Sequence, residues 1–148
     1  MSTPNFRLYF IPALTITLGG IIMIGVTWLG YYGIYLFLEQ VVYGANYQLI
    51  RIDLLRNFAA LGFALIMIPF LKLKTNHLLK AVIITGPLAG LMIAVVLAFY
   101  LDMLLALFII GMLNIAVVFA NQHFNGPWYY YYSAFISTIV SLLYAWPR

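Results

Sequence analysis

The residues of this 148-residue sequence that could do chemistry are few, because only seven are Lys or Arg and only three are Asp or Glu. The three acids are Glu39, Asp53 and Asp102, and Arg51 and Arg56 flank the second of them. Neighbouring carboxylates could perform acid–base chemistry. An arginine that holds one carboxylate could also leave another free for a cation or a small polar ligand. We therefore take Glu39, Asp53, Arg56 and Asp102 as a candidate ligand or ion pocket. In the alternative, each charge reaches water or an intrahelical partner by itself.

Other polar side chains add little to this set. Asn114 lies within a long apolar stretch, where it either makes an interhelical hydrogen bond or joins the candidate pocket as part of a solute path. His77 and His123 flank polar turns, whereas haem ligands face the interior of a bundle, so these histidines do not favour a haem site. The sequence contains no cysteine, which excludes disulfides, thiolate metal sites and cysteine nucleophiles.

No familiar catalytic pattern is present in the sequence. It contains no set of nucleophile, histidine and acid, no HExxH motif and no glycine-rich phosphate loop. We therefore predict no catalytic residues, no metal and no cofactor, and we favour a protein that is not an enzyme. A cofactor-bearing or catalytic membrane subunit would have to depend on the two histidines.

The elements that position these residues follow from the composition. Hydrophobic residues make up 66% of the chain and charged residues 7%, with a mean hydropathy of +1.08, whereas about 25% of the residues of a soluble domain are charged. So few charges cannot cover a water-facing surface, and the hydrophobic side chains must face lipid. The net charge of the chain is +4, and its Lys and Arg residues lie between apolar runs. This placement suits orientation in a bilayer rather than binding to nucleic acid.

We predict an all-α integral membrane bundle of five transmembrane helices, which forms a single domain over residues 1–148. A spanning helix needs about 20 apolar residues. The first apolar run is longer than the roughly 7–15 residues of the apolar region of a signal peptide, so we expect it to be an uncleaved span. The second span could begin earlier, near Ile50. The spans are expected at residues 8–38, 54–71, 78–100, 103–120 and 127–146.

Aromatic and charged residues divide between the two sides of this arrangement. The side of the membrane that holds the N-terminus is called side A, and the opposite side is called side B. Tyr and Trp gather on both sides, as they do at membrane interfaces. Lys and Arg favour the cytoplasmic side of a membrane. Side A holds four of these residues and side B holds three, which predicts that the N-terminus is inside and the C-terminus outside. We expect a multi-pass protein of the plasma (cell) membrane. Side A holds Arg7, Lys72, Lys74 and Lys80, and side B holds Arg51, Arg56, Arg148 and all three acids.

Small residues recur at helical spacing in two of the predicted spans. On a helix they form a narrow face that lets another backbone approach closely. This face either packs within the monomer or docks against a second copy or another membrane subunit, so a homo-oligomer or a partner membrane subunit is expected besides the lipid bilayer. The positions are Gly86, Gly90, Ala94 and Ala98 in the third span and Thr15, Gly19, Gly30 and Gly33 in the first.

Two short stretches are similar to elements of a known signalling module. Residues 50–56, IRIDLLR, resemble the hydrophobic–Asp–Leu–Arg entry of the five-transmembrane sensor module of LytS-type histidine kinases. Residues 86–91, GPLAGL, are similar to its Gly-Pro-x-x-Gly-Leu element. Here an additional leucine separates Asp53 from Arg56. The resemblance covers about half of the chain and implies a sensory membrane module in which Asp53 and Arg56 are the matching positions.

Besides the cofactor-bearing or catalytic subunit, two functional classes remain open. The favoured one is a non-enzymatic polytopic membrane module that senses a signal or docks as a subunit of a larger membrane complex. It needs little polar chemistry and uses the small-residue faces. The alternative is a small-solute or ion transporter, or the substrate-binding membrane subunit of one. A transporter would use Asp102, Asn114 and a break in the third span at Gly86 and Pro87.

Overall fold

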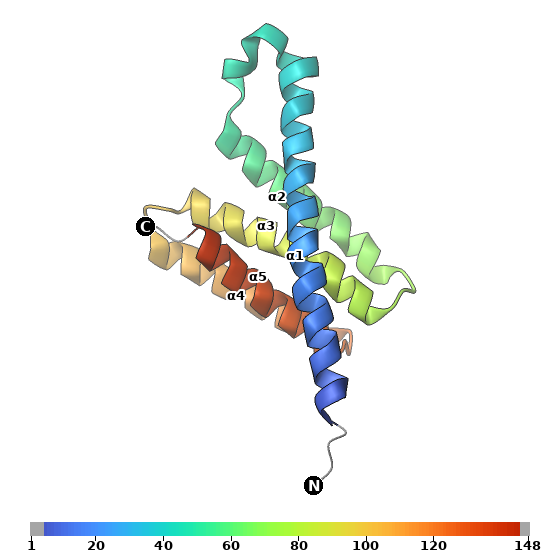
Figure 1. Ribbon diagram of the computed structural model, residues 1–148. Coiled ribbons are helices and arrows are strands. Elements are labelled where there is room, and N and C mark those ends of the chain that lie inside the picture. Colours follow the sequence, from blue (N-terminus) through green and yellow to red (C-terminus); the bar gives the residue numbers. More distant parts are fainter. Residues whose placement is uncertain (1–4, 146–148) are drawn as a thin grey trace.

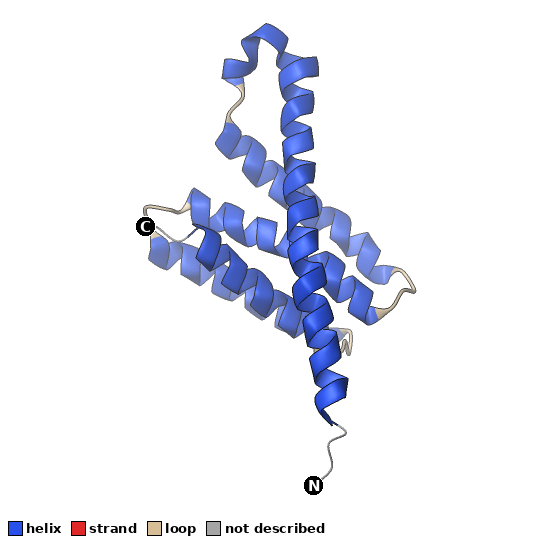
Figure 2. Cartoon of the chain, in the orientation of Figure 1, coloured by secondary structure: helices blue, strands red, loops and turns tan. Residues whose placement is uncertain are grey.

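The computed structural model describes residues 5–145, except for the side chains of residues 5–7 and of Tyr47. Every regular element within these residues is helical (Figure 1 and Figure 2). Two short helical turns, Leu38–Tyr43 and Gly44–Leu49, connect the first two long helices. The five long helices are α1 (Asn5–Phe37), α2 (Ile52–Lys72), α3 (His77–Ala98), α4 (Met103–His123) and α5 (Tyr129–Ala145).

The predicted all-helical fold is confirmed, and four helical segments are long and apolar enough to cross a membrane. These are Leu8–Asn46, which contains most of α1, the first turn after it and the start of the second, together with α2, α3 and α4. α5 has 17 residues and begins with a run of tyrosines, so the count of five spans stays a prediction. Trp146, Arg148 and the side chain of Arg7, on which the predicted spans and orientation also depend, lie outside the described residues.

Polar residues in the short turns fix where α3 and α4 begin. The Asn76 side-chain oxygen accepts a hydrogen bond from the Leu78 N–H at 2.9 Å. Asp102 Oδ1 accepts one from the Leu105 N–H at 3.1 Å. Such N-caps satisfy backbone donors that have no partner inside the helix. The Asp102 carboxylate is therefore engaged at the start of α4.

α3 is the central helix of the fold. It packs against each of the other four, whereas α4 approaches neither α1 nor α2. Nine residues of α3 are buried, against two in α2 and three in α4. Figure 1 shows α1 crossing the other helices obliquely and extending beyond α3, α4 and α5 at both ends. The core of the protein is thus the surface of α3 rather than the interior of a closed bundle.

The contact between α1 and α3 is a close approach of two backbones. A Cβ atom added at Gly86 of α3 would collide with the backbone oxygen of Met23 and would lie 2.6 Å from Thr27 Oγ1. On α1, a Cβ atom added at Gly19 would lie 2.7 Å from Val82 Cγ1. Glycine at these positions lets the helices approach closely enough for van der Waals contact to hold them in lipid.

Three other small residues predicted to pack also lie at helix contacts. Ala94 is buried on α3. A Cβ atom added at Gly90 would make an ordinary contact with Thr27 Cγ2 at 3.4 Å. At Gly30, a Cβ atom would lie 2.9 Å from the ring of Phe63, which belongs to α2. α1 therefore uses successive small residues to pack first on α3 and then on α2.

Gly33 and Ala98, which the sequence pattern also assigns to helix packing, lie on open surface. A Cβ atom added at Gly33 has nothing within 4 Å, and Ala98 is exposed. The reason is positional: Gly33 lies beyond the contact of α1 with Phe63, and Ala98 is the last residue of α3. A packing role for either residue would need a partner outside the monomer.

We predict that Gly86→Ala lowers the melting temperature of the protein in detergent, because the new methyl group meets a backbone oxygen that has no rotamer to change. Overpacking of this kind costs about 1–3 kcal/mol. The matched control is Gly62→Ala in α2, where an added Cβ meets nothing within 4 Å and alanine is favoured over glycine by about 0.5–1 kcal/mol. Equal melting temperatures for the two variants would contradict the close contact.

Candidate functional site

α5 carries three buried serines on the face that packs against α3. Ser133, Ser137 and Ser141 are at most 1% exposed, and they recur once per helical turn. The Ser133 hydroxyl donates to the Ala81 carbonyl at 3.0 Å and lies 2.8 Å from the Thr85 hydroxyl. Ser137 Oγ lies within hydrogen-bonding distance, 3.1 Å, of the Thr85 carbonyl oxygen. Side chains of α5 therefore bond directly to the backbone of α3.

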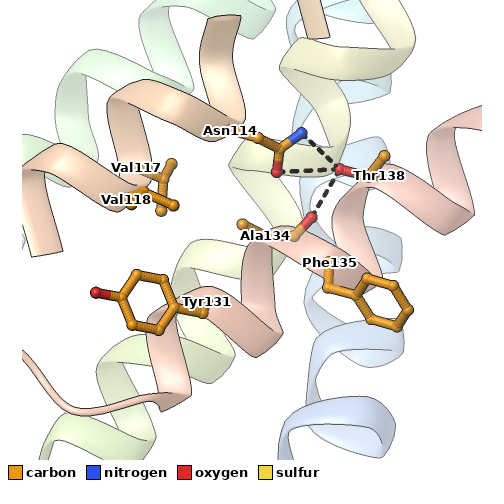
Figure 3. Close-up of a pocket in the computed structure, with 7 residues that line it drawn as sticks. All are labelled: Asn114, Val117, Val118, Tyr131, Ala134, Phe135 and Thr138. Atoms are coloured by element: carbon orange, nitrogen blue, oxygen red, sulfur yellow. Dashed lines mark hydrogen bonds between the residues drawn. The ribbon is translucent and has the colours of Figure 1, made fainter. Parts of the chain in front are cut away.

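Asn114 of α4 forms a hydrogen-bonded pair with Thr138 of α5. Its amide nitrogen lies 3.0 Å from Thr138 Oγ1 and 2.9 Å from the Ile110 carbonyl oxygen. Figure 3 shows the pair at a cavity of about 230 Å³. The polar atoms of both side chains already have protein partners there. The other lining residues are Val117, Val118, Tyr131, Ala134 and Phe135.

Of the charged residues predicted to share a pocket, two lie together. Asp53 Oδ1 and Arg56 Nη2 are 3.6 Å apart in the first turns of α2, and the Asp53 side chain is 79% exposed, so water weakens this ion pair. Arg56 Nε and Asn57 Oδ1 are buried without a hydrogen-bond partner among the described residues. Asp102 caps α4 instead, and Glu39 lies in the turn after α1. None of these side chains lines the cavity beside Asn114 or a second cavity beside Lys80.

A second cavity, of about 420 Å³, contains residues that the sequence interpretation did not assign to a site. Lys80 of α3 is 6% exposed, and its ammonium group donates to the Leu71 carbonyl of α2 at 2.7 Å. His77 Nδ1 and the Tyr130 hydroxyl are 3.1 Å apart. The signal in the sequence is the charge of Lys80 in the first turn of an apolar helix, which by itself predicts only orientation in the membrane. The cavity is lined by Ile68, Leu71, Lys72, His77, Lys80, Ile84, Leu88, Val117, Ala120, Asn121, Phe124, Gly126 and Tyr130.

The buried hydroxyl groups have a structural use. A serine or threonine nucleophile needs a neighbouring base, whereas Ser133 and Ser137 have backbone carbonyls and Thr85 as neighbours. His77 and His123 are both exposed. The arrangement accounts for helix packing and places no base beside these hydroxyls.

Comparisons with known proteins do not identify a relative. No family model, no curated protein and no solved structure matches the chain. Within residues 5–145, no group of three or more His, Cys, Asp or Glu side chains is placed to hold a metal ion. Function is therefore inferred from the geometry of this chain alone.

We predict that Asn114 and Thr138 are energetically coupled. In a double-mutant cycle of Asn114→Ala and Thr138→Ala, the losses in unfolding free energy should depart from additivity by about 0.6 kcal/mol, the typical strength of an interhelical hydrogen bond in a membrane bundle. The control pair is Asn114→Ala with Ser133→Ala, which share no partner and should add within about 0.3–0.5 kcal/mol. Denaturation in mixed micelles measures both cycles. Coupling no larger than in the control pair would show that the bond contributes nothing.

Proposed function

We propose that this chain is a non-enzymatic, multi-pass membrane module that docks onto a partner membrane helix through the outer face of α1. The observation that carries the proposal is that α1 packs along one face only. On the side of α3 and α5 it buries Ile16 and Gly20. The opposite face is exposed at three- and four-residue spacing, at Leu18, Ile22, Gly25, Leu29, Tyr32 and Gly33.

Two glycines suit this outer face to another helix. A Cβ atom added at Gly25 or Gly33 meets no atom within 4 Å, so packing inside the monomer requires neither glycine. Glycine is also about 0.8–1.0 kcal/mol less favourable than alanine within a helix. Helices in lipid associate where small residues let their backbones approach. A second copy of this chain or another membrane subunit would fit such a face.

Transport, the alternative function considered for this sequence, has less support. Many transporters bind their substrate at discontinuous helices, whereas α3 continues through Pro87 from His77 to Ala98. The Asn114 amide is occupied by Thr138 and by its own helix. The features that a solute path would use therefore serve packing.

A sensory role would act through the same elements. The two stretches that resemble the LytS-type module are the start of α2, where Asp53 and Arg56 pair, and the part of α3 where Gly86 meets α1. A signal that changed the α1–α3 contact would alter the outer face of α1. Docking and sensing are thus compatible parts of one proposal.

The proposal includes five spans in the plasma membrane. With 17 residues, α5 is about 26 Å long, close to the roughly 30 Å of the hydrocarbon core. The chain is also rich in Trp and Tyr where α5 begins, and these residues favour the membrane interface.

Reporter fusions test the number of spans and the orientation. We expect a reporter after Lys74 to lie in the cytoplasm and one after Arg148 to lie outside, because three spans separate the two positions and Lys and Arg favour side A inside. Alkaline phosphatase, which is active only outside, and a fluorescent protein that is active inside give complementary signals. Signals from the same side at both positions would show that α5 does not cross.

Site-specific photocrosslinking tests the docking face. The chain has no cysteine, so Ile22→Cys can carry a single maleimide–benzophenone probe beside Gly25. Ultraviolet irradiation of intact membranes should give a protein adduct, and its mass identifies a second copy of the 16.8 kDa chain or another subunit. The control is Leu104→Cys, which is 81% exposed on α4.

A companion variant tests the role of the glycine. Gly25→Leu in the Ile22→Cys background should reduce the adduct several-fold, because leucine holds the partner helix away. The melting temperature of the monomer should not fall, since Gly25 has open space around it. Equal labelling of protein at Ile22→Cys and Leu104→Cys, or an adduct that ignores Gly25→Leu, would rule out docking at this face.

A further inference from the structure

The cavity beside Lys80 lies where α2 and α4 flank α3 without approaching each other. Its volume of about 420 Å³ falls within the range of small-molecule sites, roughly 300–1,000 Å³. α1 contributes no lining residue. An inference about this cavity therefore does not depend on the docking proposal for α1.

The cavity is polar at one end and apolar along its floor. The floor follows α3 from Lys80 through Ile84 to Leu88, residues about one turn apart that together extend about 12 Å. The polar end lies where α2 and α4 end and where α3 and α5 begin, which is side A. A ligand that fills it would be polar at one end and apolar along its length. The polar lining residues are Lys72, His77, Lys80, Asn121 and Tyr130.

Lys80 supplies a buried ammonium group that has donors to spare. It is 6% exposed, and its Nζ donates to the Leu71 carbonyl at 2.7 Å, close to the C-terminus of α2, where a positive charge is favourable. An ammonium group has three donors, and this bond uses one. Buried charges are stable when they are paired, so a negatively charged acceptor in the cavity would stabilise Lys80.

The acids of this chain lie too far away to pair with Lys80. Asp53 is in the first turn of α2, about 27 Å along the helix from Leu71. Asp102 precedes α4, about 28 Å along that helix from Asn121. Glu39 lies in the turn after α1. Among the described residues, none of these carboxylates can pair with Lys80, so a ligand is the available source of negative charge.

The groups around Lys80 favour a phosphate group over a single carboxylate. Lys72 lies at the exposed rim of the cavity and gives a second ammonium group. The contact of the Tyr130 hydroxyl with His77 Nδ1 at 3.1 Å holds that hydroxyl in the cavity wall. Several donors around one anion suit a group with several acceptor oxygens, and lysine is a common phosphate ligand.

We propose that this cavity binds an anionic phospholipid, with the phosphate at Lys80 and Lys72 and an acyl chain over Ile84 and Leu88. Basic pockets between transmembrane helices on the cytoplasmic side are suited to anionic headgroups. Free phosphate shares the chemistry of the head but would leave the apolar floor unfilled. A zwitterionic lipid would add no net negative charge to this end.

Thermal unfolding of the full chain in neutral detergent tests this proposal. The probes are phosphatidylglycerol, phosphatidylcholine with the same acyl chains, and inorganic phosphate. Phosphatidylglycerol should raise the melting temperature in a saturable manner, because ligands that bind only the folded state stabilise it. The other two probes should have little effect at the same concentrations.

Three variants locate the binding. Lys80→Gln removes the buried charge and keeps a donor for the Leu71 carbonyl, and it should weaken phosphatidylglycerol binding by about tenfold or more, as expected for loss of a charge-assisted hydrogen bond. Lys72→Gln, on the exposed rim, should weaken binding less and supplies the comparison if Lys80→Gln does not fold. Lys74→Gln is the matched control, because Lys74 is exposed on the same side and does not line the cavity.

Any of the following three results would contradict the proposal. Equal shifts with phosphatidylglycerol and phosphatidylcholine would show that the charge of the head is not recognised. If inorganic phosphate alone raised the melting temperature as much as phosphatidylglycerol does, the acyl chain would not be part of the ligand that the cavity recognises. An equal loss of affinity in Lys74→Gln and Lys72→Gln would mean that lipid responds to the general positive charge of side A. None of these results would affect the photocrosslinking test of α1.

Discussion

Four helical segments of this chain are long and apolar enough to cross a membrane. Lipid is as apolar as their own side chains, so burying apolar surface against a neighbour gives little advantage over lipid there. The helices are therefore held together by contacts that lipid cannot provide. Backbone meets backbone where Gly86 packs on α1, and hydroxyl groups of α5 reach the carbonyls of Ala81 and Thr85. Both kinds of contact lie on α3, which packs against each of the other four long helices.

This arrangement leaves a well-packed centre and open margins. α2 and α4 each pack on α3 but not on each other, and the gap between their side chains becomes a cavity with Lys80 at its end. α1 packs on one side and exposes the other. The proposed lipid site and the proposed docking face thus use different elements, and both follow from the small number of contacts beyond the centre.

The helices could be predicted from the sequence because lipid exposure shows directly in runs of apolar residues, and the glycines at the α1–α3 contact show in their spacing. The spacing alone could not distinguish Gly30, which packs against Phe63, from Gly33, which has no atom within 4 Å of an added Cβ. The path of α1 across the other helices decides which glycine meets a neighbour. Asp102 was assigned to a pocket, but the Leu105 N–H lies nearby in the chain and binds it. The cavity beside Lys80 depends on the separation of two helices, which no local pattern records.

The contact at Gly86 also has a genetic consequence. Where a glycine faces a side chain, as Gly19 faces Val82, a harmful larger residue can be rescued by trimming the neighbour. Gly86 faces the backbone oxygen of Met23, and every amino acid at position 23 carries that atom. A second-site suppressor of a Gly86 substitution would therefore have to change the course of a whole helix, so this position tolerates exchange much less than Gly19 does.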